Sequence, residues 1–99
     1  MEKLKLFIDL HDAENQTFPK GISKQDFAGF HSQYEKACRE EGVVNLNILV
    51  GFDAARAFCL NLAPNVEAVK RAHEKVGLPY DTIVEINSST PTDIFFNKI

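Results

Sequence analysis

The chain has 99 residues, of which 44% are hydrophobic and 25% charged, and its formal net charge is −3. This length and composition fit one small globular domain, and the scattered basic residues argue against a nucleic-acid partner. The apolar run near the N-terminus is too short for a signal sequence or a membrane span, so we expect a cytoplasmic protein. Cys38 and Cys59 are interpreted as reduced thiols, as is usual in that compartment.

The chain begins with a predicted strand over residues 3–11, because apolar and polar side chains alternate there. After a loop, Ser23 is the predicted cap of a helix that ends at Gly42. Residues 43–50 are rich in β-branched and leucine side chains and are predicted to form a strand, and residues 56–62 are predicted to form the second strand of the pair. The short turn between these two strands predicts an antiparallel hairpin.

The second helix is predicted to begin after its cap, Asn65, and to end at Gly77, which Pro79 follows two residues later. Residues 82–86 then form a last short strand. Two strand–helix–strand halves in this order are typical of the α+β, ferredoxin-like βαββαβ sandwich. In that fold, two helices cover one face of a four-stranded antiparallel sheet. We expect the domain to span residues 1–87.

Apolar side chains occur on both faces of the first predicted strand. Its leucine and isoleucine residues share one face, and Phe7 interrupts the polar residues of the other. Both faces are therefore expected to be covered, most simply by a second copy of the chain that makes a homodimer through the sheet. Residues 88–99 form a tail that includes Ile94-Phe95-Phe96, and we expect this apolar run to pack as an arm or strand on the domain or its dimer partner.

No local catalytic or metal-binding motif is present, since the sequence lacks CxxC, HExxH and a glycine-rich phosphate loop. His11 ends the first strand, His31 lies on the first helix, and His73 lies on the inward stripe of the second. Asp9 shares the strand face of His11 because it lies two residues earlier. The topology permits Asp9 and the two helical histidines to lie at about the same height along the sheet, with His11 above them.

Each of these residues also has a purely structural interpretation. A lone histidine on an apolar stripe is more often a hydrogen-bonded core residue than a ligand, and Asp9 can serve to fix the tautomer of His11. Cys59 and Tyr34 fit a packed core equally well. Taken together, however, imidazole, carboxylate and thiolate groups suit a borderline divalent ion such as Ni²⁺, Zn²⁺ or Cu²⁺.

Three segments are distinctive: Phe7-Ile8-Asp9-Leu10-His11-Asp12, Ala57-Phe58-Cys59-Leu60-Asn61-Leu62-Ala63-Pro64, and His73 followed by Gly77-Leu78-Pro79. With the residues between them, over about 4–87, they resemble a family of small bacterial ferredoxin-like domains of unknown function that includes a nickel-binding protein. The resemblance implies a dimer joined through its sheets and a bound divalent metal ion, nickel in at least one relative.

The placement of these side chains and the family resemblance together single out six candidate residues. The candidate metal ligands are His11, His31 and His73, and the candidate supporting residues are Asp9, Cys59 and Tyr34. This chain has Val76 at the position just before Gly-Leu-Pro, where relatives often carry a histidine. A metal site that used that histidine would be weakened or lost in this chain.

Three functions remain open at the level of the sequence. The first is a metal-binding protein that buffers or senses a nickel-type divalent ion. The second is a small cofactor-free enzyme of the dimeric α/β-barrel type, in which His73 or His31 is the general base. The third is a ligand-binding or regulatory module without chemistry. The enzyme ranks below metal binding because no nucleophile–base pair is evident.

Overall fold

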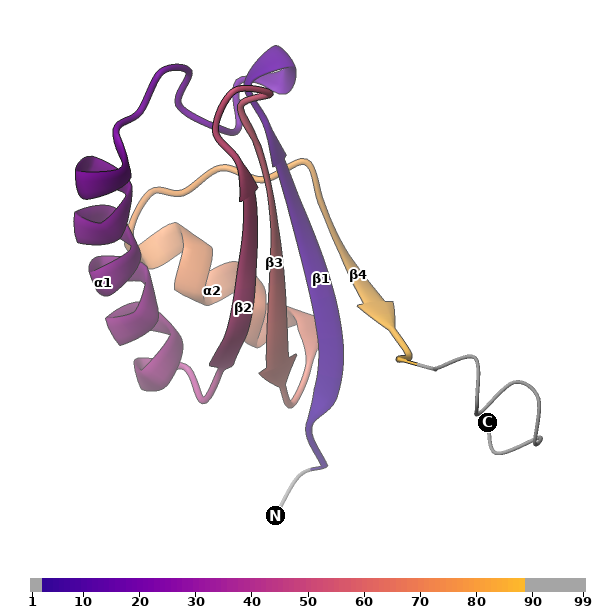
Figure 1. Ribbon diagram of the computed structural model, residues 1–99. Helices are drawn as coiled ribbons and strands as arrows, with labels where there is room; N and C mark the ends of the chain where they lie inside the picture. The colour runs from indigo at the N-terminus through magenta and orange to yellow at the C-terminus, as the bar shows by residue number, and fades with distance from the viewer. Residues whose placement is uncertain (1–2, 89–99) are drawn as a thin grey trace.

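Residues 3–88 are described by a computed structural model of the chain, in which four strands form one antiparallel sheet. The elements in chain order are β1 (Lys5–Asp12), a short 3-10 turn (Ala13–Asn15), α1 (Lys24–Glu40), β2 (Val44–Gly51), β3 (Arg56–Ala63), α2 (Val66–Lys75) and β4 (Thr82–Ile86). The strand order is β2-β3-β1-β4, and both helices lie on one face of the sheet (Figure 1). The predicted α+β, ferredoxin-like fold is therefore confirmed.

Both helices begin at the caps that the sequence predicted. The side chains of Ser23 and Asn65 accept hydrogen bonds from the backbone amide three residues on, at 3.0 and 2.9 Å. After α1 and α2, Gly42 and Gly77 have φ values of 74° and 63°, a left-handed conformation that glycine adopts without strain. These short-range signals fix where α2 starts and stops, and thereby the position of His73 on it.

Removal of the α2 cap gives a first testable effect. Asn65→Ala is expected to lower the free energy of unfolding by about 1 kcal/mol, because one backbone amide of the first turn loses its acceptor. For a domain of this size, that corresponds to a fall in Tm of roughly 4–8 °C. Thermal unfolding followed by circular dichroism measures it. Gln33→Ala, at an exposed position in α1, is the control, and equal Tm values for the two variants would contradict the role of the cap.

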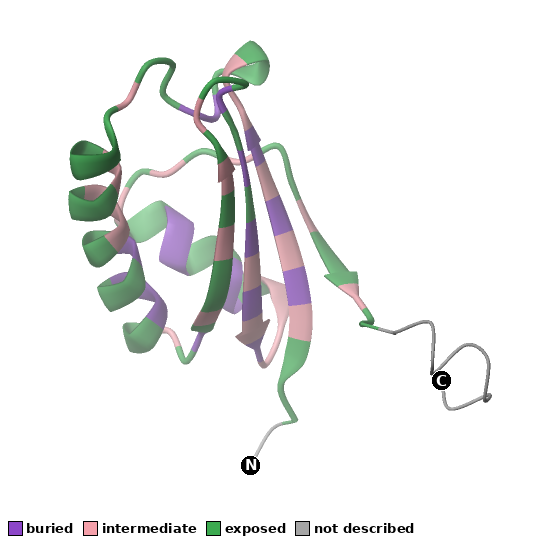
Figure 2. Ribbon diagram, viewed as in Figure 1, coloured by how far each residue is buried: buried purple, intermediate pink, exposed green. Residues whose placement is uncertain are grey.

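The buried face of the sheet carries an apolar core and a polar cluster side by side. Phe7 packs with Tyr34 and Val69 in the principal apolar cluster. Asp9 and His11 follow Phe7 along the same face of β1 and are also buried, which produces the alternating pattern on that strand in Figure 2. The leucine and isoleucine residues of β1 therefore face away from the helices.

The outer face of the sheet is apolar, and none of the described residues 3–88 packs over it. Val44, Leu49, Phe58 and Val84 are exposed there, and the outward residues of β1 are half-buried. A surface of this kind commonly meets a partner. The homodimer through the sheet stays a prediction, and this face is the surface that it would use.

The predicted packing of the tail stays a prediction, because Ile94-Phe95-Phe96 lies outside the described residues 3–88. Within the described part of the chain, no helix combines the length and the apolar character that crossing a bilayer demands.

β2 contains one β-bulge just after Asn45 in its pairing with β3. Asn45 pairs with Asn61, and Ile48 pairs with Cys59, and both partners belong to the buried face of β3. Asn45 and Ile48 therefore both face the helices although they are three positions apart. The extra residue, Leu46, is exposed.

Candidate metal centre

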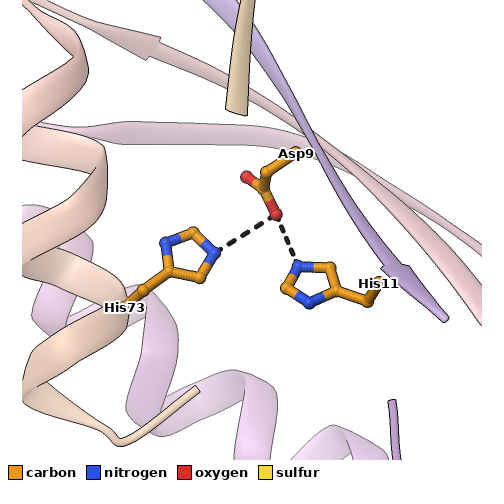
Figure 3. Close-up of side chains that lie close together, drawn as sticks. All are labelled: Asp9, His11 and His73. Carbon is orange, nitrogen blue, oxygen red and sulfur yellow. Dashed lines mark hydrogen bonds and ion pairs between the residues drawn. The ribbon is translucent and has the colours of Figure 1, made fainter. Parts of the chain in front are cut away.

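Three side chains with metal-binding atoms meet between the sheet and α2. Asp9 and His11 come from β1 and His73 from α2, and both imidazoles approach the same oxygen of Asp9 (Figure 3). Asp9 Oδ1 lies 2.6 Å from His11 Nε2 and 3.2 Å from His73 Nε2. One ligand atom from each residue lies within 4.8 Å of the others, and all three side chains are buried. The structure thus brings together two of the predicted ligands and the predicted supporting carboxylate.

Backbone carbonyls fix the second nitrogen of each imidazole. His73 Nδ1 donates to the carbonyl of Val69, one turn earlier in α2, at 2.8 Å. His11 Nδ1 lies 2.8 Å from the carbonyl of Pro79 and 3.2 Å from that of Thr17. Because a carbonyl oxygen only accepts, both rings carry hydrogen on Nδ1 and present Nε2 to Asp9. Metal-binding histidines are usually oriented by a hydrogen bond of this kind from the nitrogen that does not bind the metal.

The charges of Asp9 and His11 stabilise each other. Burial alone would raise the pKa of Asp9, but hydrogen bonds and charge interactions with the two imidazoles outweigh burial and lower that pKa. Burial alone would lower the pKa of His11, but the Asp9 carboxylate and two backbone carbonyls raise it overall. Without a metal, the pair is therefore a buried carboxylate and an imidazolium whose two nitrogens both face acceptors.

The donor set fits a divalent metal ion. Adjacent ligand atoms around an ion with bonds of about 2.1 Å lie about 3 Å apart, which is close to the two Asp9–imidazole separations. Two imidazoles and one carboxylate bind first-row divalent ions well and leave coordination positions open. A cation here would displace the proton of His11 Nε2, and the Asp9 carboxylate would offset part of its charge.

His31, the third predicted ligand, lies outside this group and connects to it through two asparagines. Asn61 Nδ2 donates to Asp9 Oδ2 at 2.8 Å, and Asn45 Nδ2 donates to Asn61 Oδ1 at 2.8 Å. The Nε2 of His31 donates to Asn45 Oδ1 at 3.0 Å. The three histidines therefore belong to one hydrogen-bonded network, but the ligand atoms that converge in the described part of the chain are those of Asp9, His11 and His73.

Tyr34 and Cys59, both predicted as supporting residues, border the centre as neutral groups. The ring of Tyr34 packs edge-on against that of His73 with centroids 5.0 Å apart. Cys59 lies directly opposite Asp9 in the pairing of β1 with β3. Burial raises the pKa of the Tyr34 hydroxyl and of the Cys59 thiol, so both keep their protons at neutral pH.

Val76 occupies the position where the resembling family often has a histidine. It is the residue that ends α2, and its half-buried side chain packs against the principal apolar cluster. The group of Asp9, His11 and His73 forms without any contribution from this position, so the departure noted in the sequence leaves these three residues intact.

The sequence did not predict a role for three residues that border or connect to the centre: Asn45, Asn61 and Tyr80. The ring of Tyr80 lies edge-on to that of His73, with centroids 5.0 Å apart. Asn61 carried a usable signal. It occupies the inward face of β3 among small, weakly polar residues, and a buried amide requires partners. Asn45 carried no such signal, because the bulge after it hides the direction of its side chain.

Comparison with known proteins matches the chain to a protein family and to a solved structure. Residues 7–86 match the model of a family described as nickel responsive protein SCO4226-like. The fold is similar to the crystal structure of SCO4226 from Streptomyces coelicolor A3(2), with a TM-score of 0.73 and 26% sequence identity, over 86% of this chain and 99% of that chain. No functionally curated protein matches the chain. The family match includes all three residues of the candidate metal centre.

Proposed function

Since this chain belongs to the SCO4226-like family of nickel responsive proteins, we propose that it binds a nickel-type divalent metal ion. The family resemblance seen in the sequence is thereby confirmed. The observation that carries the proposal is the convergence of Asp9, His11 and His73, with both imidazoles held through Nδ1 so that Nε2 meets the carboxylate. The ion would be held by Asp9 Oδ1 and by the Nε2 atoms of the two histidines.

Buffering or sensing of the ion is the role that we infer. In the metal-free protein, each imidazole of the centre has its Nδ1 against a backbone carbonyl and its Nε2 against Asp9 Oδ1, so neither ring directs a nitrogen to a substrate. A general base needs a nitrogen within hydrogen-bond reach of the proton that it removes. This argues against His73 as the base of an enzyme. It leaves reversible exchange of a proton for a metal ion as the chemistry that the centre supports.

Calorimetric titration of Ni²⁺ into the untagged, metal-free protein tests the proposal. We expect saturable binding with a Kd well below about 1 mM, the range in which ordinary surface histidines compete. Because the raised pKa of His11 keeps its Nε2 protonated, affinity should increase with pH, by roughly tenfold per unit below that pKa. Titrations in two buffers of different ionisation enthalpy measure the proton release. Absence of saturation at millimolar Ni²⁺, or affinity independent of pH, would contradict the proposed centre.

A further inference from the structure

α1 packs closely on the sheet only through its second half. Tyr34, Ala37 and Cys38 are buried there, whereas Phe27 and Phe30 in the first half are half-buried. These two phenylalanines line a cavity of about 580 Å³ between α1 and the sheet. That volume lies within the range of about 300–1,000 Å³ that is typical of small-molecule sites.

The cavity has walls on several sides, and they are mostly apolar. Ile48 and Ala57 line it from the sheet, Phe18 and Ile22 from the loop before α1, and Leu78 from the segment after α2. An α-helix about 10 Å across occupies roughly 120 Å³ per residue, so the cavity would hold fewer than about five residues of a docked helix. Its size therefore fits a small molecule better than a segment of protein.

The polar residues of the cavity differ in what they can still bind. His11 also lines it, but both of its nitrogens are already engaged. The Tyr34 hydroxyl lies 3.4 Å from the amide of Asn61. The Nε2 of His31 is engaged with Asn45, whereas its Nδ1 has no hydrogen-bond partner among the described residues 3–88. Of the two imidazoles that line the cavity, His31 is therefore the one with an unused ring nitrogen.

The orientation of the two asparagine amides determines the character of that nitrogen. Asn61 turns its amide nitrogen toward Asp9 Oδ2 and its oxygen toward Asn45, whose own amide nitrogen donates to that oxygen. Asn45 must in turn present its oxygen to His31, which requires hydrogen on Nε2. In the tautomer with its hydrogen on Nε2, His31 has an Nδ1 lone pair that can accept a hydrogen bond.

We propose that this cavity binds a small, mostly apolar aromatic molecule that carries one hydroxyl or amine donor directed to His31 Nδ1. The aromatic body contacts Phe27 and Phe30 and buries their exposed surface, and the donor satisfies the ring nitrogen. This site goes beyond the metal centre, because the ligand requires no metal and contacts neither Asp9 nor His73.

Titration of the metal-free protein with 2-naphthol, followed by ¹H–¹⁵N NMR in the presence of a chelator, tests the proposal. We expect saturable shifts confined to the walls of the cavity, namely residues 16–22, the first half of α1, residues 48, 57 and 59 of the sheet, and residues 77–79, with a Kd below about 1 mM. 2-Methoxynaphthalene, which has the same rings but no donor, should bind about threefold to tenfold more weakly. His31→Ala should remove that difference. Shifts centred on the outer face of the sheet, no saturation, or equal affinity for the two compounds would overturn the proposal.

Two neighbouring residues on β2 provide a matched pair of variants. Ile48 faces the cavity and Leu49 faces outward, so Ile48→Trp should fill the site and abolish 2-naphthol binding, whereas Leu49→Trp should leave it unchanged. Ile22→Trp, which fills the cavity from the loop, is the second blocking variant in case Ile48→Trp does not fold. Unchanged affinity in a folded blocking variant would overturn the proposal. Ni²⁺ binding is measured separately, so failure of one site does not imply failure of the other.

Discussion

His73→Ala is expected to weaken Ni²⁺ binding by at least about 100-fold, because loss of a direct ligand should exceed the 10–100-fold cost of losing a residue that only orients one. The substitution removes the Nε2 atom 3.2 Å from Asp9 Oδ1 and leaves two converging protein ligands in place of three. Calorimetric titration at one fixed pH measures the change. His73→Gln, which keeps more of the buried volume, serves as a second variant in case the alanine substitution does not fold.

The matched control for this experiment is His31→Ala. His31 is the predicted ligand that the structure places outside the converging group, where it hydrogen-bonds to Asn45 instead. Its loss should change Ni²⁺ affinity by less than about tenfold, since it acts on Asp9 only through two intervening asparagines. If both substitutions reduced the affinity equally, His31 would contribute to binding as much as His73 does, and its placement outside the metal centre would be wrong.

Asp9→Ala is expected to destabilise the metal-free protein by about 3–5 kcal/mol, because it leaves the imidazolium of His11 buried without a counter-charge. The amide of Asn61 loses its acceptor in the same step. A fall in Tm of at least about 12 °C would follow for a domain of this size. Chemical and thermal unfolding measure the effect, and Asp53→Ala, in the exposed turn after β2, is the control. A loss below about 1 kcal/mol would contradict a buried ion pair.

The difference in free energy of unfolding between wild type and Asp9→Ala should depend on pH, because two pKa values are shifted in the folded protein. The pKa of Asp9 is lowered, so its contribution is present above about pH 4 and is lost as the pH falls through the folded-state value. The pKa of His11 is raised, so its contribution is present below about pH 6.5 and is lost as the pH rises through the folded-state value. The difference between wild type and Asp9→Ala should therefore be largest between these limits.

Most of the fold could be predicted because its signals are short-range. Ser23 and Asn65 at the helix starts, Gly42 and Gly77 at their ends, and the alternating strands each act over a few residues. The order of the elements then restricts the topology to few arrangements. The strand order and the single helical layer follow from that restriction.

The candidate site could be predicted only in part, because β1 is apolar on both faces. Hydrophobicity alone does not reveal that the helices cover the face of Phe7, Asp9 and His11 rather than the face of the leucines. A buried carboxylate and imidazole are stable there only because they satisfy each other, and that compensation depends on partners distant in sequence, such as His73. His31 was predicted as a ligand because helix periodicity gives the direction of a side chain but not its distance from another.

The bulge in β2 changes what a single strand can supply. In a regular strand, residues separated by an odd number of positions point to opposite faces, so Asn45 and Ile48 would serve different sides of the sheet. The inserted Leu46 resets the phase, and one eight-residue strand then provides both a hydrogen-bonding link to the buried carboxylate and a wall of the aromatic cavity. An insertion or deletion of one residue here would disconnect one of these two features while leaving the other in register.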